Sequence, residues 1–121
     1  MTDKVYDLKK RTYFYALDII RFLESLPKDY ISQVIGKQLL RSATSVGANI
    51  IEAQAASSRK DFINFYNYSL KSANESKFWL ELLKDSGKAA SDTVVPILNE
   101  TTELSSILAA SILTMKGMRK F

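Results

Sequence analysis

Apolar residues recur every three or four positions along four long stretches of the chain, and this spacing constrains the fold more than any other feature. Side chains spaced in this way lie on one face of an α-helix, so each stretch predicts an amphipathic helix. No run alternates apolar and polar residues with a period of two, so strands are not expected. The predicted helices span residues 7–26, 30–56, 59–85 and 93–118.

The breaks between these stretches carry residues that are typical of turns and helix ends. Pro27 to Asp29 separates the first two stretches, Ser57-Ser58 precedes the third, and Ser86-Gly87 begins the connection to the fourth. Pro96 falls in the first turn of the fourth predicted helix, where its missing amide is tolerated. Short connections make consecutive helices antiparallel neighbours. We therefore expect one all-α domain over residues 1–121, an antiparallel up-down-up-down four-helix bundle.

Several large apolar residues lie outside the four core stripes. A small monomer would expose them, and extended exposed apolar patches usually mark an interface. A wide core face with scattered surface aromatics is the alternative, but three of the helices show the same excess, so we favour self-association. The candidates for an oligomer interface are Phe14, Leu17, Leu40, Ile51, Phe65, Tyr68 and Trp79.

The segment from Gln38 to Glu52, QLLRSATSVGANIIE, is unusual for a helix that fills a core. It contains Gly47, which costs about 1 kcal/mol relative to Ala in a helix interior. It also contains several small residues that permit the close approach of another helix or subunit. Close packing and a polar site are the two explanations for this composition.

The charged residues of this segment need partners from elsewhere if they are buried. Arg41 and Glu52 are eleven residues apart, about 16 Å along a helix axis, so they cannot pair with each other. Glu75 on the next helix is a candidate partner, as are Lys71 and Lys77. We favour a role in helix register or subunit contacts over catalysis. The candidates for assembly or for buried polar contacts are Arg41, Ser45, Ala48, Asn49, Glu52 and Glu75.

The composition excludes several classes of chemistry. The chain has no Cys and no His, which excludes disulfides, Cys nucleophiles, Ser-His-Asp catalysis and an ordinary zinc site. Its four Gly residues are scattered and form no phosphate-binding loop. The acidic residues lack the Glu-x-x-His motifs of di-iron bundles. We therefore expect no enzyme activity, no cofactor and no metal.

The charge of the chain leans basic, with a net charge of +4 and a pI of about 9.3. Solvated helix faces explain most of the cations, but a ring of identical subunits would multiply the charge. Such a surface would bind phosphate backbones with strong salt dependence and little base specificity. The nucleic-acid-binding candidates are Lys9, Lys10, Arg11, Arg21, Lys37, Arg59 and Lys60.

The chain contains neither a membrane-spanning apolar run nor a signal-peptide pattern. We therefore expect a cytoplasmic protein without a membrane partner.

One set of residues resembles a known family. The pattern comprises Gln38-Leu39, Arg41, Ala43, Ser45-Val46, Ala48-Asn49-Ile50 and Glu52, followed by Lys60-Asp61-Phe62, Tyr68-Ser69-Leu70, Ser72-Ala73 and Glu75. It is similar to that of the 23S rRNA intervening-sequence proteins, also called the S23 ribosomal protein family. The resemblance implies a four-helix bundle that forms homopentameric barrels. It also extends to the accessory variability proteins of diversity-generating retroelements, which bind nucleic acid and a reverse transcriptase.

These observations lead to two hypotheses about function. The first is a non-enzymatic homo-oligomer, a pentamer by resemblance, that binds RNA or DNA, such as rRNA, through basic helix surfaces. The second is a scaffold that holds a partner protein through its apolar faces and has no affinity for nucleic acid.

Overall fold

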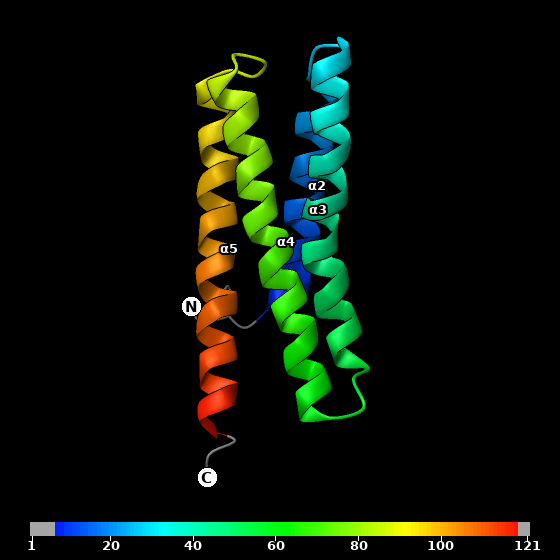
Figure 1. The fold of residues 1–121 in the computed structure, drawn as a ribbon, viewed down its shortest axis with the longest axis vertical. Coiled ribbons are helices and arrows are strands. Elements are labelled where there is room, and N and C mark those ends of the chain that lie inside the picture. Colours follow the sequence, from blue (N-terminus) through cyan, green and yellow to red (C-terminus); the bar gives the residue numbers. More distant parts are fainter. Residues whose placement is uncertain (1–6, 119–121) are drawn as a thin grey trace.

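The computed structural model describes residues 7–118 and contains four α-helices and no strand within that range. The helices are α2 (Leu8–Glu24), α3 (Tyr30–Gln54), α4 (Arg59–Asp85) and α5 (Ser91–Met118). They lie side by side along the long axis of the molecule, and the chain reverses direction at each connection (Figure 1). The predicted all-α four-helix bundle is therefore confirmed. The helix α2 is the shortest and leaves part of α3 without a neighbour on that side.

Polar side chains cap the helices close to the predicted helix ends. Asp29 caps α3 by accepting hydrogen bonds from the backbone amide and the hydroxyl of Ser32, both at 2.9 Å. Ser58 caps α4 by accepting from the Asp61 amide at 3.0 Å. The fourth helix begins at Ser91 rather than at residue 93, so Pro96 lies in its second turn. Because Pro has no amide hydrogen, the exposed carbonyl of Asp92 lacks its usual helical donor.

The core is a column of branched aliphatic residues with buried hydroxyls among them. Leu39, Ile50, Leu80 and Leu108 are at most 1% exposed. Between α3 and α4, Ser42 and Ser76 share a hydrogen bond of 2.8 Å, and the Ser69 hydroxyl donates to the Val46 carbonyl at 2.7 Å. These small, satisfied polar residues let α3 and α4 approach closely without leaving unpaired buried groups.

The glycine inside α3 marks the closest approach of α2. A Cβ atom added to Gly47 would lie 3.0 Å from the Thr12 hydroxyl oxygen and 3.2 Å from the Thr12 Cβ. The Thr12 hydroxyl itself is buried and donates to the Leu8 carbonyl at 2.6 Å. Close helix packing therefore accounts for Gly47, one of the two explanations open from the sequence.

Polar contacts between residues far apart in the sequence join α2 to α5 along their interface, which we call the α2–α5 seam. The Tyr15 and Thr101 hydroxyls share a hydrogen bond of 2.7 Å in the core, and burial raises the pKa of Tyr15 to about 12. Nearer the N-terminal end of α2, Arg11 pairs with Glu100 at 2.8 Å and with Glu103 at 2.6 Å. Grooves open on the surface along this seam, lined in part by Phe14, Tyr15 and Glu100.

Candidate functional site

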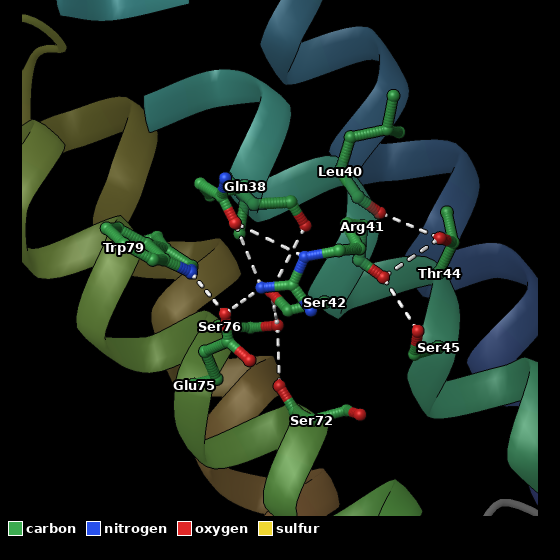
Figure 2. A network of polar contacts seen from close by, with 11 residues as sticks. Gln38, Leu40, Arg41, Ser42, Thr44, Ser45, Ser72, Glu75, Ser76 and Trp79 are labelled. Atoms are coloured by element: carbon green, nitrogen blue, oxygen red, sulfur yellow. Dashed lines mark hydrogen bonds and ion pairs between the residues drawn. The ribbon is translucent and has the colours of Figure 1, made fainter. Parts of the chain in front are cut away.

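A polar cluster centred on Arg41 and Glu75 joins α3 to α4 (Figure 2). The guanidinium of Arg41 forms an ion pair with the Glu75 carboxylate, as the sequence predicted. The same guanidinium donates to the Gln38 side-chain oxygen at 3.0 and 3.2 Å from two of its nitrogens. The Trp79 indole, one turn along α4, donates to the Glu75 oxygen that also accepts from Arg41, at 2.9 Å.

This cluster is half-exposed rather than buried. The Arg41 side chain is 56% exposed and the Glu75 side chain 36%. Hydrogen bonds from the Trp79 indole and then from Arg41 lower the pKa of Glu75. A salt bridge of this exposure contributes at most about 1 kcal/mol to folding. The cluster therefore fixes the orientation of its side chains more than it stabilises the monomer.

Apolar side chains surround this cluster on α4. At 100° per residue, Tyr68, Trp79 and Leu82 lie within about 40° of Glu75 around the helix. Tyr68 is 51% exposed and Leu82 37%, while Trp79 is half-buried. We call this surface the α3/α4 face, defined by Arg41, Ser45 and Glu52 of α3 and by Tyr68, Glu75, Trp79 and Leu82 of α4.

A second apolar surface lies on the other side of α3. It is a groove of about 590 Å³ between α2 and α3, which we call the α2/α3 groove. Its lining residues are Asp7, Lys9, Lys10, Thr12, Tyr13, Phe14, Ala16, Thr44, Gly47, Ala48 and Ile51. Small residues contribute much of this lining, and exposed Tyr13, Phe14 and Ile51 give it a mainly apolar surface.

Four of the seven predicted interface residues fall on these two surfaces, namely Phe14, Ile51, Tyr68 and Trp79. Tyr68, Phe14, Leu40 and Ile51 are exposed, at 51%, 53%, 39% and 53% respectively. The other three predicted residues, Leu17, Phe65 and Trp79, are half-buried.

The predicted polar candidates of α3 differ in their surroundings. Ser45 and Asn49 bond to carbonyls of their own helix, at 2.8 and 2.9 Å. Ala48 and Glu52 are exposed. Within residues 7–118, Glu52 forms no ion pair. The carboxylate of Glu52 therefore faces solvent in the single chain.

The predicted cations do not gather on one face. Arg21 and Lys37 lie in the half of the bundle that contains the α2–α3 connection, whereas Lys9, Lys10, Arg59 and Lys60 lie in the other half. All six are exposed, and Arg21 is 3.6 Å from Asp18 on its own helix.

Arg11 differs from the other predicted cations. Its side chain is only 10% exposed, and Glu100 and Glu103 bind it directly. The hydrogen bond to Glu100 is the main cause that raises the pKa of Arg11. This guanidinium joins α2 to α5 and is not free to bind a phosphate, contrary to the expectation from its place among surface cations.

Two kinds of feature are absent from the described residues. Between residues 7 and 118, no group of three or more acidic side chains is arranged to hold a metal ion. None of the helices in that range is long and apolar enough to cross a membrane.

Comparison with known proteins identifies the family. The sequence profile described as 23S rRNA-intervening sequence protein matches residues 4–110. The chain belongs to this family. A solved protein of unknown function from the S23 ribosomal protein family, from Bacteroides thetaiotaomicron VPI-5482, is 39% identical to this chain, with a TM-score of 0.83. The similarity covers 90% of this chain and 97% of that one. No curated protein matches the chain.

The structure also shows contacts that the sequence did not predict. The Trp79 indole was expected at an apolar interface but also holds Glu75 in place. The four-residue spacing of Glu75 and Trp79 on one helix was the available signal. The Arg11 contacts had no such signal, because Glu100 is 89 residues away in sequence.

Proposed function

We propose that this protein is a non-enzymatic building block that assembles with identical copies into a closed ring, of five subunits as the family resemblance implies, and binds RNA or DNA through its basic helix residues. The observation that carries the assembly is the α3/α4 face. It presents Tyr68 and Leu82 to solvent beside a pre-ordered Arg41–Glu75–Trp79 cluster. Aromatic side chains and Arg are enriched in the energetic centres of interfaces.

The presence of a second, different surface favours a ring over a dimer. A two-fold dimer uses the same patch on both subunits, whereas a ring joins two different patches. The α3/α4 face and the α2/α3 groove lie on different sides of α3 and differ in composition. One subunit therefore offers the two unlike surfaces that a closed ring requires.

Nucleic-acid binding rests on the exposed cations at one end of the bundle. Arg59 and Lys60 begin α4 and lie exposed beside the α3–α4 connection. In a ring whose axis runs along the bundles, this end would repeat around a rim, where phosphates could bind to several subunits at once. Binding of this kind weakens steeply as salt rises, because each phosphate contact releases counterions.

The nucleic-acid part is tested by retention of rRNA and of generic duplexes at low salt. Wild-type protein should bind and release as salt is raised. Arg59→Glu with Lys60→Glu should reduce binding while leaving the mass of the assembly unchanged. Lys28→Glu, at the opposite end of the bundle, is the matched control. Failure of the wild type to bind any of these probes at low salt would contradict the proposal.

A second candidate function is a protein-binding scaffold without nucleic-acid affinity. The scattered positions of Arg21, Lys37 and Arg59, and the neutralised charge of Arg11, favour it. A partner complex that survives nuclease treatment and high salt would support this function over the first.

A further inference from the structure

The two surfaces beside α3 carry opposite unpaired charges. Lys9 lines the α2/α3 groove, and Glu52 lies on the α3/α4 face. Within residues 7–118 neither side chain forms an ion pair. Both are exposed, so each is available to a second molecule.

Lys9 and Glu52 do not pair with each other within residues 7–118 of one subunit. Gly47 faces α2 and contacts Thr12, whereas Glu52 is five residues further along, about 140° around the helix from Gly47. Ala48, which also lines the groove, is about 40° from Glu52 around the helix, so Glu52 lies beside the outer edge of the groove. The carboxylate is therefore displaced around α3 from Gly47, where α2 packs closest.

The same two residues lie at nearly the same height along the bundle. The contacts of Thr12 with Gly47, and of Leu23 with Gly36, set the antiparallel register of α2 and α3. This register places Lys9 level with Ile50, so Glu52 is offset by only two residues, on the order of 3 Å. In a ring whose axis is parallel to the bundles, groups at equal height in neighbouring subunits come together.

The aromatic part of the α3/α4 face lies at the height of the groove. Ser69 donates to the Val46 carbonyl, which places Tyr68 level with about residue 47 of α3. The groove extends from Thr44 to Ile51 along that helix. A half-exposed Tyr68 side chain therefore matches an apolar groove with a volume of about 590 Å³ at the same height.

We infer that the α2/α3 groove of one subunit receives the α3/α4 face of the next, with Tyr68 entering the groove and Glu52 pairing with Lys9 of the neighbouring copy. This inference rests on the proposed ring and specifies which surfaces meet. It assigns Lys9 to the subunit interface rather than to nucleic acid. We assign the groove to a second copy of this chain because that copy supplies both the Glu52 carboxylate for Lys9 and the Tyr68 ring for the apolar groove.

Charge reversal tests the pairing directly. Lys9→Glu and Glu52→Lys should each raise the concentration at which half the protein assembles by about tenfold, because like charges then meet. The combined variant restores an opposite pair and should assemble within about threefold of wild type, as expected for coupled residues in a double-mutant cycle. Sedimentation equilibrium at low salt measures the assembly of the wild type, the two single variants and the double variant. Circular dichroism verifies that helix content is unchanged.

A steric variant provides a second test that does not depend on charge. Ala48 is exposed and lines the groove, so Ala48→Trp should fold normally and block docking of the neighbour. Ala110→Trp, at an exposed position of α5, is the matched control and should assemble as wild type does.

The outcomes separate this inference from the proposed function. A wild-type protein that stays monomeric would overturn both. An assembly that is unaffected by single charge reversals and by Ala48→Trp would overturn the assignment of surfaces alone. A double reversal that assembles no better than either single variant would also contradict the Lys9–Glu52 pair. Reduced assembly of the single variants with recovery in the double variant would support it.

Discussion

One carboxylate oxygen of Glu75 accepts hydrogen bonds from both the Arg41 guanidinium of α3 and the Trp79 indole of α4. This shared acceptor fixes a cation and an aromatic ring side by side on the surface. Ordering these side chains costs conformational entropy, and a half-exposed ion pair returns little stability to a monomer. We therefore interpret the cluster as a surface prepared for another subunit.

Replacing Arg41 should affect assembly more than folding. Arg41→Leu should lower the free energy of unfolding of dilute protein by less than about 1 kcal/mol, because the ion pair is half-exposed. The same change should lower the oligomer mass measured by sedimentation. Arg21→Leu is the control, since Arg21 is exposed and its ion pair is with Asp18 on the same helix. An Arg41→Leu protein that sediments as wild type would contradict the role that we assign to the cluster.

The pH dependence of stability should report on Glu75. Hydrogen bonds from Trp79 and Arg41 lower its folded pKa, so its stabilising contribution is fully present above the unfolded value of about 4.3. The contribution is lost as pH falls through the folded pKa, because protonation removes the charge. Asp29 acts in the same direction, since the Ser32 amide lowers its pKa. Glu75→Gln should therefore give a shallower loss of stability between about pH 5 and pH 3.

Acid titrations followed by circular dichroism measure this slope. Glu81→Gln, an exposed position on the same helix, should leave the slope as in wild type. Identical slopes for Glu75→Gln and wild type would show that the Glu75 contacts are too weak to matter.

Two glycines of the bundle should respond oppositely to substitution by alanine. At Gly47 the added Cβ would lie 3.0 Å from the Thr12 hydroxyl oxygen, and overpacking of about 1–3 kcal/mol should outweigh the gain of about 1 kcal/mol in helix propensity. At Gly117 nothing lies within 4 Å of the added atom, so alanine should stabilise α5 by up to about 1 kcal/mol. Urea denaturation of Gly47→Ala and Gly117→Ala measures both. Equal effects at the two sites would argue against a tight α2–α3 crossing.

The Tyr15–Thr101 hydrogen bond should behave as a coupled pair. Thr101→Val leaves the buried Tyr15 hydroxyl without this partner, which costs about 1–3 kcal/mol. Tyr15→Phe removes the hydroxyl itself, so adding it to Thr101→Val should cost less than it does in wild type. A double-mutant cycle from thermal or urea unfolding quantifies the coupling. Strict additivity would mean that the α2–α5 seam does not depend on this bond.

The sequence predicted the helices well because each buries one regular stripe. It also offered Glu75 as one candidate partner on the next helix, and Glu75 does form an ion pair with Arg41. The sequence could not predict the Arg11 contacts. Glu100 and Glu103 are 89 and 92 residues away, and only the packing of the first helix beside the last brings them together. The reason for Gly47 was equally hidden, because it depends on where α2 crosses α3.

The central claim is that this chain assembles with copies of itself, and its mass in solution tests that claim most directly. Light scattering of the eluting wild-type peak, at several loading concentrations and low salt, gives this mass without reference to shape. The account predicts a single species several times heavier than the 13.7 kDa chain, and fivefold heavier for the ring that the family resemblance implies. A stable species of 13.7 kDa at every concentration would contradict it.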